Sequence, residues 1–124
     1  MPSSRPTVFV GESSPTTQAE LKEKLDRQGV EAYLARCAIA PVSPSDFIGG
    51  FKCALMTLER VGSHDDAMSE LELLRMYQPG LAVAFLHGNA SIHQLARASS
   101  MGPVFRKDDQ LDAAIAWVVE RTRA

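Results

Sequence analysis

Apolar residues in this chain fall into five short runs separated by longer amphipathic stretches. The runs cover residues 7–10, 30–35, 53–59, 81–86 and 104–105. Short apolar or alternating runs bounded by turn residues predict strands. The run 53–59 (CALMTLE) and the run 81–86 (LAVAFL) are almost continuously apolar, which is typical of strands buried on both faces of a sheet.

The stretches between these runs predict helices. Between Ser13 and Gly29, Leu21 and Leu25 recur at helical spacing, and Pro15 suits a first turn. Further helices are predicted over 69–78, over 91–101 and after Asp108 or Asp109. In the helix over 69–78, the apolar residues available for burial are Leu71, Leu74 and Met76. In the last helix, one face carries Leu111, Ala114, Ile115 and Val118. A shorter helix is expected from Ser43 or Ser45 to Phe51, although Gly49 and Gly50 weaken it.

Regular alternation of strands and helices predicts an α/β fold with one parallel sheet between two helical layers. The length of 124 residues suits one such domain. Ligands in parallel sheets bind beyond the carboxyl ends of the strands. The residues that end the strands are therefore expected to lie together, namely Glu12 and Ser13, Glu59, His87 and Lys107.

Composition excludes several classes of protein. The net charge of -2 without a basic block argues against nucleic-acid binding, and no apolar run approaches the roughly 20 residues of a membrane span. Without a signal-peptide pattern at the N-terminus, we expect a cytoplasmic location. Cys37 and Cys53 are expected to be separate buried thiols. The spacings of His64, His87 and His93 fit no zinc pattern, so no metal site is predicted.

Four segments carry a resemblance to a known family. They are TVFVGESSP (7–15), MSELELLR (68–75), LAVAFLHGNASIHQLARASSMG (81–102) and FRKDDQLDAAI (105–115). In order and spacing, these segments resemble receiver domains of two-component response regulators, in particular the FixJ-like subgroup. The resemblance covers nearly the whole chain. It implies a flavodoxin-like (CheY-like) sheet of five parallel strands flanked by five helices.

The resemblance also implies a site, and this sequence departs from the family at most of its positions. Receivers take a phosphoryl group on an aspartate, hold Mg²⁺ with an acidic pair, and contact the phosphoryl group through a Thr or Ser and a lysine. Glu59 stands at the aspartate position, and Glu12 and Ser13 stand at the acidic pair. His87 replaces the Thr or Ser, whereas Lys107 matches the family's lysine. Mg²⁺ binding is therefore expected to be weak or lost, and no other cofactor is expected.

Several roles stay open at this stage. Glu59 is either a mimic of the phosphorylated state that pairs with Lys107, or a position that has lost its signalling role. The aromatic switch position of the family falls on Val104 or Phe105. Trp117 is either an interface residue or part of the core margin.

These observations lead to three functional hypotheses. The first is a stand-alone degenerate receiver over residues 1–124, without an output domain or enzymatic activity. It would act by contact with a histidine kinase, another signalling protein or its own copy, through the helix at 91–101, the strand at 104–105 and the last helix. The second is a weakly active phospho-acceptor that uses Asp65 or Asp66 with Mg²⁺ held by Glu12. The third is an unrelated small flavodoxin-like binding protein, which no Gly-rich phosphate loop supports.

Overall fold

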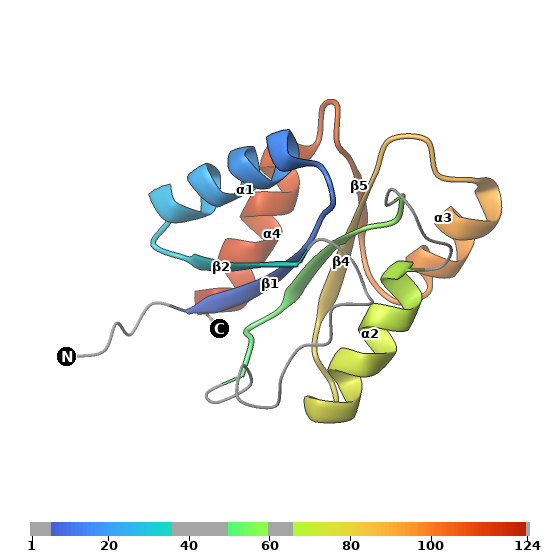
Figure 1. The fold of residues 1–124 in the computed structure, drawn as a ribbon, viewed down its shortest axis with the longest axis horizontal. Coiled ribbons are helices and arrows are strands. Elements are labelled where there is room, and N and C mark those ends of the chain that lie inside the picture. Colours follow the sequence, from blue (N-terminus) through green and yellow to red (C-terminus); the bar gives the residue numbers. More distant parts are fainter. Residues whose placement is uncertain (1–5, 36–49, 60–65, 124) are drawn as a thin grey trace.

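The computed structural model describes residues 6–35, 50–59 and 66–123, and side chains throughout these ranges except at 35 and 66–68. The described chain contains five strands and four helices (Figure 1). The strands are β1 (Thr7–Gly11), β2 (Glu31–Ala35), β3 (Ala54–Thr57), β4 (Val83–His87) and β5 (Val104–Arg106). The helices are α1 (Pro15–Arg27), α2 (Asp66–Tyr77), α3 (Ile92–Ser99) and α4 (Leu111–Arg123).

The five strands form one parallel sheet in the order β2-β1-β3-β4-β5. The chain moves outward from β1 to β2 and then crosses back to β3 on the other side of β1. The order therefore reverses between β1 and β3, and in open α/β sheets the crevice beyond such a reversal is the usual ligand position.

The core consists of two apolar clusters, one on each face of the sheet. Phe9, Met56 and Phe85 belong to the cluster that also holds Leu71 and Leu74 of α2. The opposite cluster contains Leu21 and Leu25 of α1 and the buried side of α4. Figure 1 accordingly shows α1 and α4 together on one side of the sheet and α2 and α3 on the other. This arrangement is the three-layer sandwich that the alternation of elements predicts.

Local sequence explains where the helices begin and end. The Ser14 hydroxyl accepts from the Thr17 amide at 3.4 Å, and Pro15 opens α1. Gly29, with a φ of 74°, follows the end of this helix in the left-handed region that favours glycine. At α3, Ser91 and Gln94 form a reciprocal capping box.

Among the described glycines, Gly102 leaves the least space for a side chain. A Cβ atom at this position would lie 2.0 Å from the main-chain oxygen of Val83 in β4. The turn after α3 can therefore pack against the central strand β4 only because residue 102 has no side chain.

Two predicted elements need correction and a third lies mostly outside the described residues. The helix expected from residue 69 begins at Asp66, so part of the predicted loop is helical, and Met76 is 76% exposed rather than buried. The strand expected to reach Glu59 ends at Thr57. The short helix expected up to Phe51 falls largely within 36–49, outside the description, and Phe51 itself is not helical. The structure therefore describes four of the five expected helices.

Candidate functional site

The carboxyl edge of the sheet gathers the predicted site residues. Glu12 directly follows β1, Glu59 comes two residues after β3, His87 ends β4, and Lys107 directly follows β5. All five strands are parallel, so these positions share one edge, as the sequence predicts.

Glu12 is the centre of a buried polar cluster. Only 1% of its surface is exposed, and its Oε2 atom lies 2.7 Å from the Lys107 ammonium. The hydroxyl of Thr57 donates to the same oxygen. The amide of Ser14 donates to Oε1 at 3.0 Å, so both carboxylate oxygens are engaged.

The surroundings of Glu12 favour its charged form on balance. Burial alone disfavours the carboxylate, but hydrogen bonds from Lys107, Thr57 and the Ser14 amide, with the charge of Lys107, outweigh that effect. The pKa of Glu12 therefore lies below its ordinary value. The carboxylate and the ammonium form a neutral pair at the end of the strands.

Glu59 does not make the predicted contact with Lys107. Lys107 pairs with Glu12, and the structure places no ion pair between Lys107 and Glu59, both of which it describes. The reason is geometric, because β3 ends at Thr57 and it is the Thr57 side chain that points to the Glu12 cluster.

The Glu59 carboxylate instead binds the main chain after β4. The amide of Gly88 lies 2.9 Å from each of its two oxygens, and the amide of Asn89 donates to Oε2. Adjacent main-chain amides that point the same way form an anion-binding concavity. The carboxylate of Glu59 fills this concavity and connects the chain after β3 to the loop before α3.

His87 contributes mainly through its backbone. Its carbonyl oxygen accepts from the Lys107 amide at 2.9 Å, which extends the pairing of β4 with β5. Its side chain is half-buried, and within the described residues its buried Nδ1 atom has no hydrogen-bond partner. Ser13, the other position of the expected acidic pair, is also half-buried.

The two candidates for the aromatic switch face opposite sides of the sheet. Val104 packs against the cluster that includes α2, whereas Phe105 packs against the cluster that includes α1 and α4. Trp117 of α4 packs partly against the same cluster as Phe105, and the Arg121 guanidinium lies 5.2 Å from its ring centroid. Trp117 is therefore a half-buried residue at the margin of the core, with a cation over its ring.

Several predicted residues take no part in this description. Asp65, His64 and Cys37 lie outside the described residues, and Asp66 begins α2 with an undescribed side chain. Cys53 is a buried free thiol whose pKa burial raises to about 12. His93 is on the exposed face of α3.

The described residues do not fit the Mg²⁺ that the resemblance implies. Within 6–35, 50–59 and 66–123, no three His, Cys, Asp or Glu side chains lie close enough together to hold a metal ion. Both oxygens of Glu12 already accept hydrogen bonds, and one of them contacts an ammonium. A divalent cation would have to displace Lys107 from this oxygen.

The sequence did not indicate which groups donate hydrogen bonds to Glu12 and Glu59. In the sequence, the only indication of a role for Thr57 is that it is a polar residue inside the apolar run CALMTLE. The partners of Glu59 are main-chain amides of Gly88 and Asn89, which leave no trace in residue type.

Comparison with solved structures identifies the fold. The chain is similar to a signal receiver domain of an HD domain-containing protein from Pseudomonas fluorescens Pf-5, with a TM-score of 0.71, 16% identity, and coverage of 96% of this chain and 98% of that one. It is also similar to a CheY-like response regulator receiver domain protein from Methanospirillum hungatei JF-1, with a TM-score of 0.72, 17% identity, and coverage of 97% and 98%. A response regulator receiver protein from Sinorhizobium medicae WSM419 gives a TM-score of 0.72 at 11% identity, with coverage of 98% and 97%.

These similarities extend over nearly the whole chain, and the chain has the CheY-like receiver fold. No protein-family model matches the sequence, and no curated protein matches it. Among the described residues, no helix has the length and apolar character needed to span a membrane.

Proposed function

We propose that this chain is a degenerate receiver, close to the FixJ-like subgroup, that acts in two-component signal transduction through protein–protein contacts. In this proposal it takes no phosphoryl group at the usual aspartate position and has no enzymatic activity. One observation carries the proposal: the chain's own carboxylates engage the polar groups at the carboxyl edge. Lys107 is bound to Glu12, and the amides of Gly88 and Asn89 are bound to Glu59.

The chemistry of phosphoryl transfer supports this interpretation. A transferred phosphoryl group needs cations and hydrogen-bond donors for its oxygens, and a carboxylate nucleophile within reach. In this chain the ammonium is already neutralised, and two amide donors already hold a carboxylate. Each carboxylate would have to be displaced before a phosphoryl group could use these donors.

Glu59 has a specific part in this proposal. Its two oxygens accept from the loop that joins β4 to α3, as the oxygens of a bound oxyanion would. It would thus hold the loop in one state without any modification. This is the mimic that the sequence suggests, except that it acts through the β4–α3 loop rather than through Lys107.

The proposed partner is a histidine kinase, another signalling protein or a second copy of the chain. The proposed contact surface consists of α3, β5 and α4. It includes the half-buried Trp117 ring, and aromatic residues that are only partly covered often anchor interfaces. Replacing Trp117 with alanine should weaken association through this surface and leave the carboxyl edge unchanged.

Intact mass after incubation with acetyl phosphate and Mg²⁺ tests the proposal directly. We expect an unchanged mass for this chain, under conditions in which a conventional receiver, run in parallel, gains one phosphoryl group. A phosphorylated species that maps to Asp65 or Asp66 would overturn the proposal in favour of the weak phospho-acceptor. Trp117 is the single tryptophan, so a change in its fluorescence on addition of a flavin or a nucleotide would favour the unrelated binding protein.

A further inference from the structure

The loop between β5 and α4 carries Lys107 and is closed by main-chain contacts of Arg106. The Arg106 amide donates to the Oε1 atom of Gln110 at 2.8 Å, and the Arg106 carbonyl oxygen accepts from the Gln110 amide at 3.0 Å. The amide of Lys107 itself donates to the His87 carbonyl oxygen at 2.9 Å. Three consecutive main-chain groups at the base of the Lys107 side chain are therefore hydrogen-bonded.

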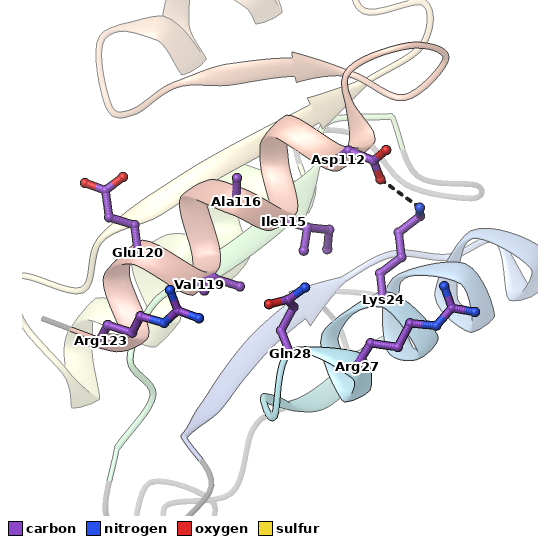
Figure 2. Close-up of a pocket in the computed structure, with 9 residues that line it drawn as sticks. All are labelled: Lys24, Arg27, Gln28, Asp112, Ile115, Ala116, Val119, Glu120 and Arg123. Atoms are coloured by element: carbon purple, nitrogen blue, oxygen red, sulfur yellow. Dashed lines mark hydrogen bonds and ion pairs between the residues drawn. The ribbon is translucent and has the colours of Figure 1, made fainter.

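Gln110 is held in place by the helix that follows it. Its carbonyl oxygen accepts from the Ala114 amide at 3.0 Å, so Gln110 is the N-cap residue of α4. The first turns of this helix are fixed in the core, because Leu111 is 8% exposed and Ala114 is fully buried. Figure 2 shows a second attachment, in which Asp112 lies 2.7 Å from Lys24 of α1. An anchored helix thus presents the Gln110 side chain to the loop.

The Arg106 side chain contributes less to this arrangement than its main chain does. The guanidinium contacts Asp109 at 2.9 Å and 3.0 Å, but both side chains are more than half exposed. Exposed ion pairs of this kind contribute little, because water solvates both charges well. The two main-chain contacts with Gln110 are therefore the main connection between the end of β5 and the beginning of α4.

The backbone position of Lys107 matters because its partner is buried. The Lys107 side chain is 23% exposed, and Glu12, whose Oε2 atom lies 2.7 Å from the ammonium, is only 1% exposed. A buried ion pair stabilises both charges only when its geometry is good, since water cannot replace a lost contact. A displacement of the Lys107 backbone would leave the Glu12 carboxylate with the Thr57 hydroxyl and the Ser14 amide alone.

We infer that Gln110 is a positioning residue that keeps the Lys107 ammonium on Glu12. Movement of Lys107 away from Glu12 would break at least one of the contacts that close the loop. The loop thus makes the Glu12–Lys107 pair an autoinhibitory contact, in which the ammonium is withheld from other anions at the carboxyl edge. The inference deepens the proposed function and rests on it for its meaning in signalling, because an ammonium bound to Glu12 does not serve a phosphoryl group.

The titration of Glu12 tests this role. The ¹³C shift of its side-chain carboxyl group is followed by NMR from pH 7 to pH 3 in the parent chain, Gln110→Leu and Gln110→Asn. Leucine removes the acceptor of the Arg106 amide, whereas asparagine keeps an amide group that is one methylene shorter. Both variants should raise the pKa of Glu12 by about 0.5 or more, because a poorly placed ammonium stabilises the carboxylate less. An unchanged pKa, or a rise in only one of the two variants, would overturn the inference.

Gln94→Leu is the matched control. The Oε1 atom of Gln94 accepts from the Ser91 amide at 2.9 Å, so this side chain makes the same kind of contact at the beginning of α3. The control should leave the pKa of Glu12 at the value of the parent chain. A rise equal to that in the Gln110 variants would mean that general loosening of the fold is the cause, and the role of Gln110 would be wrong.

This inference and the proposed function can fail separately. Phosphorylation of the parent chain by acetyl phosphate would overturn the proposed function and leave the titration of Glu12 as it is. An unchanged pKa in the Gln110 variants would overturn the positioning role and leave the Glu12–Lys107 pair, and the proposed function with it, in place.

Discussion

Glu12 and Glu59 lie at the same edge of the sheet, yet the chain stabilises their carboxylates by different means. Glu12 is almost completely buried and is balanced by a full positive charge, the Lys107 ammonium. Glu59 is half-buried and is held only by the main-chain amides of Gly88 and Asn89. A buried carboxylate needs a counter-charge, whereas a solvated one needs only donors. We therefore expect Glu12 to determine stability and Glu59 to determine the conformation of a loop.

The largest effect should come from breaking the pair at Glu12. Lys107→Met keeps most of the apolar stem but leaves the Glu12 carboxylate buried without its cation. We expect a loss of about 3 kcal/mol in the free energy of unfolding, measured by urea titration at pH 7. Lys22→Met, at an exposed position of α1, is the matched control and should change stability by less than about 0.5 kcal/mol. Equal losses in the two variants would mean that the buried Glu12–Lys107 pair contributes no more to stability than an exposed pair.

Lowering the pH should remove the contribution of Glu12 to the free energy of unfolding. The pKa of this residue in the folded chain lies below its ordinary value of 4.5. Its pairing therefore stabilises the fold fully above the unfolded pKa, and this stabilisation is lost as pH falls through the folded pKa. Glu12→Gln should be less stable than the parent chain by about 2 kcal/mol at pH 7.

Urea titrations from pH 7 to pH 3 check this expectation. The difference between parent and Glu12→Gln should start to shrink below about pH 4.5, where the unfolded carboxylate takes up a proton. A difference that stays constant across this range would mean that the charge of Glu12 contributes nothing.

The smallest change in stability should come from Glu59→Ala. Its amide partners are exposed and can bind water instead, so we expect a loss below about 1 kcal/mol. The amide resonances of Gly88 and Asn89 should move, while that of Ser14, which binds Glu12, should stay in place. Adding acetate to the variant should return the two resonances towards their original positions, because a free carboxylate can fill the same concavity. Unmoved resonances would contradict the loop role of Glu59.

The fold was predictable because its main determinants are local. Runs such as LAVAFL predict buried strands. The serine and glycine residues that flank α1 indicate where this helix begins and ends. The approximate position of the site was predictable as well, because parallel strands must end at one edge.

The pairing within the site was not predictable from residue types. Glu59 and Lys107 are a plausible pair by charge, and only the end of β3 at Thr57 decides against them. The choice of Lys107 for Glu12 depends on the register of strands that are distant in sequence. The contact of Glu59 with Gly88 and Asn89 depends on loop geometry, which no pattern of side chains encodes.

Gly102 has a further consequence for how this sequence can vary. The atom that a side chain would meet there belongs to the backbone of β4, so no replacement of a neighbouring side chain can create the missing space. In a library that replaces every residue in turn, position 102 should accept glycine alone. At Gly88, by contrast, an added Cβ atom would meet only the end of the Glu59 side chain at 3.3 Å, and that side chain can turn away. A side chain at position 88 should therefore be tolerated far more readily than one at position 102.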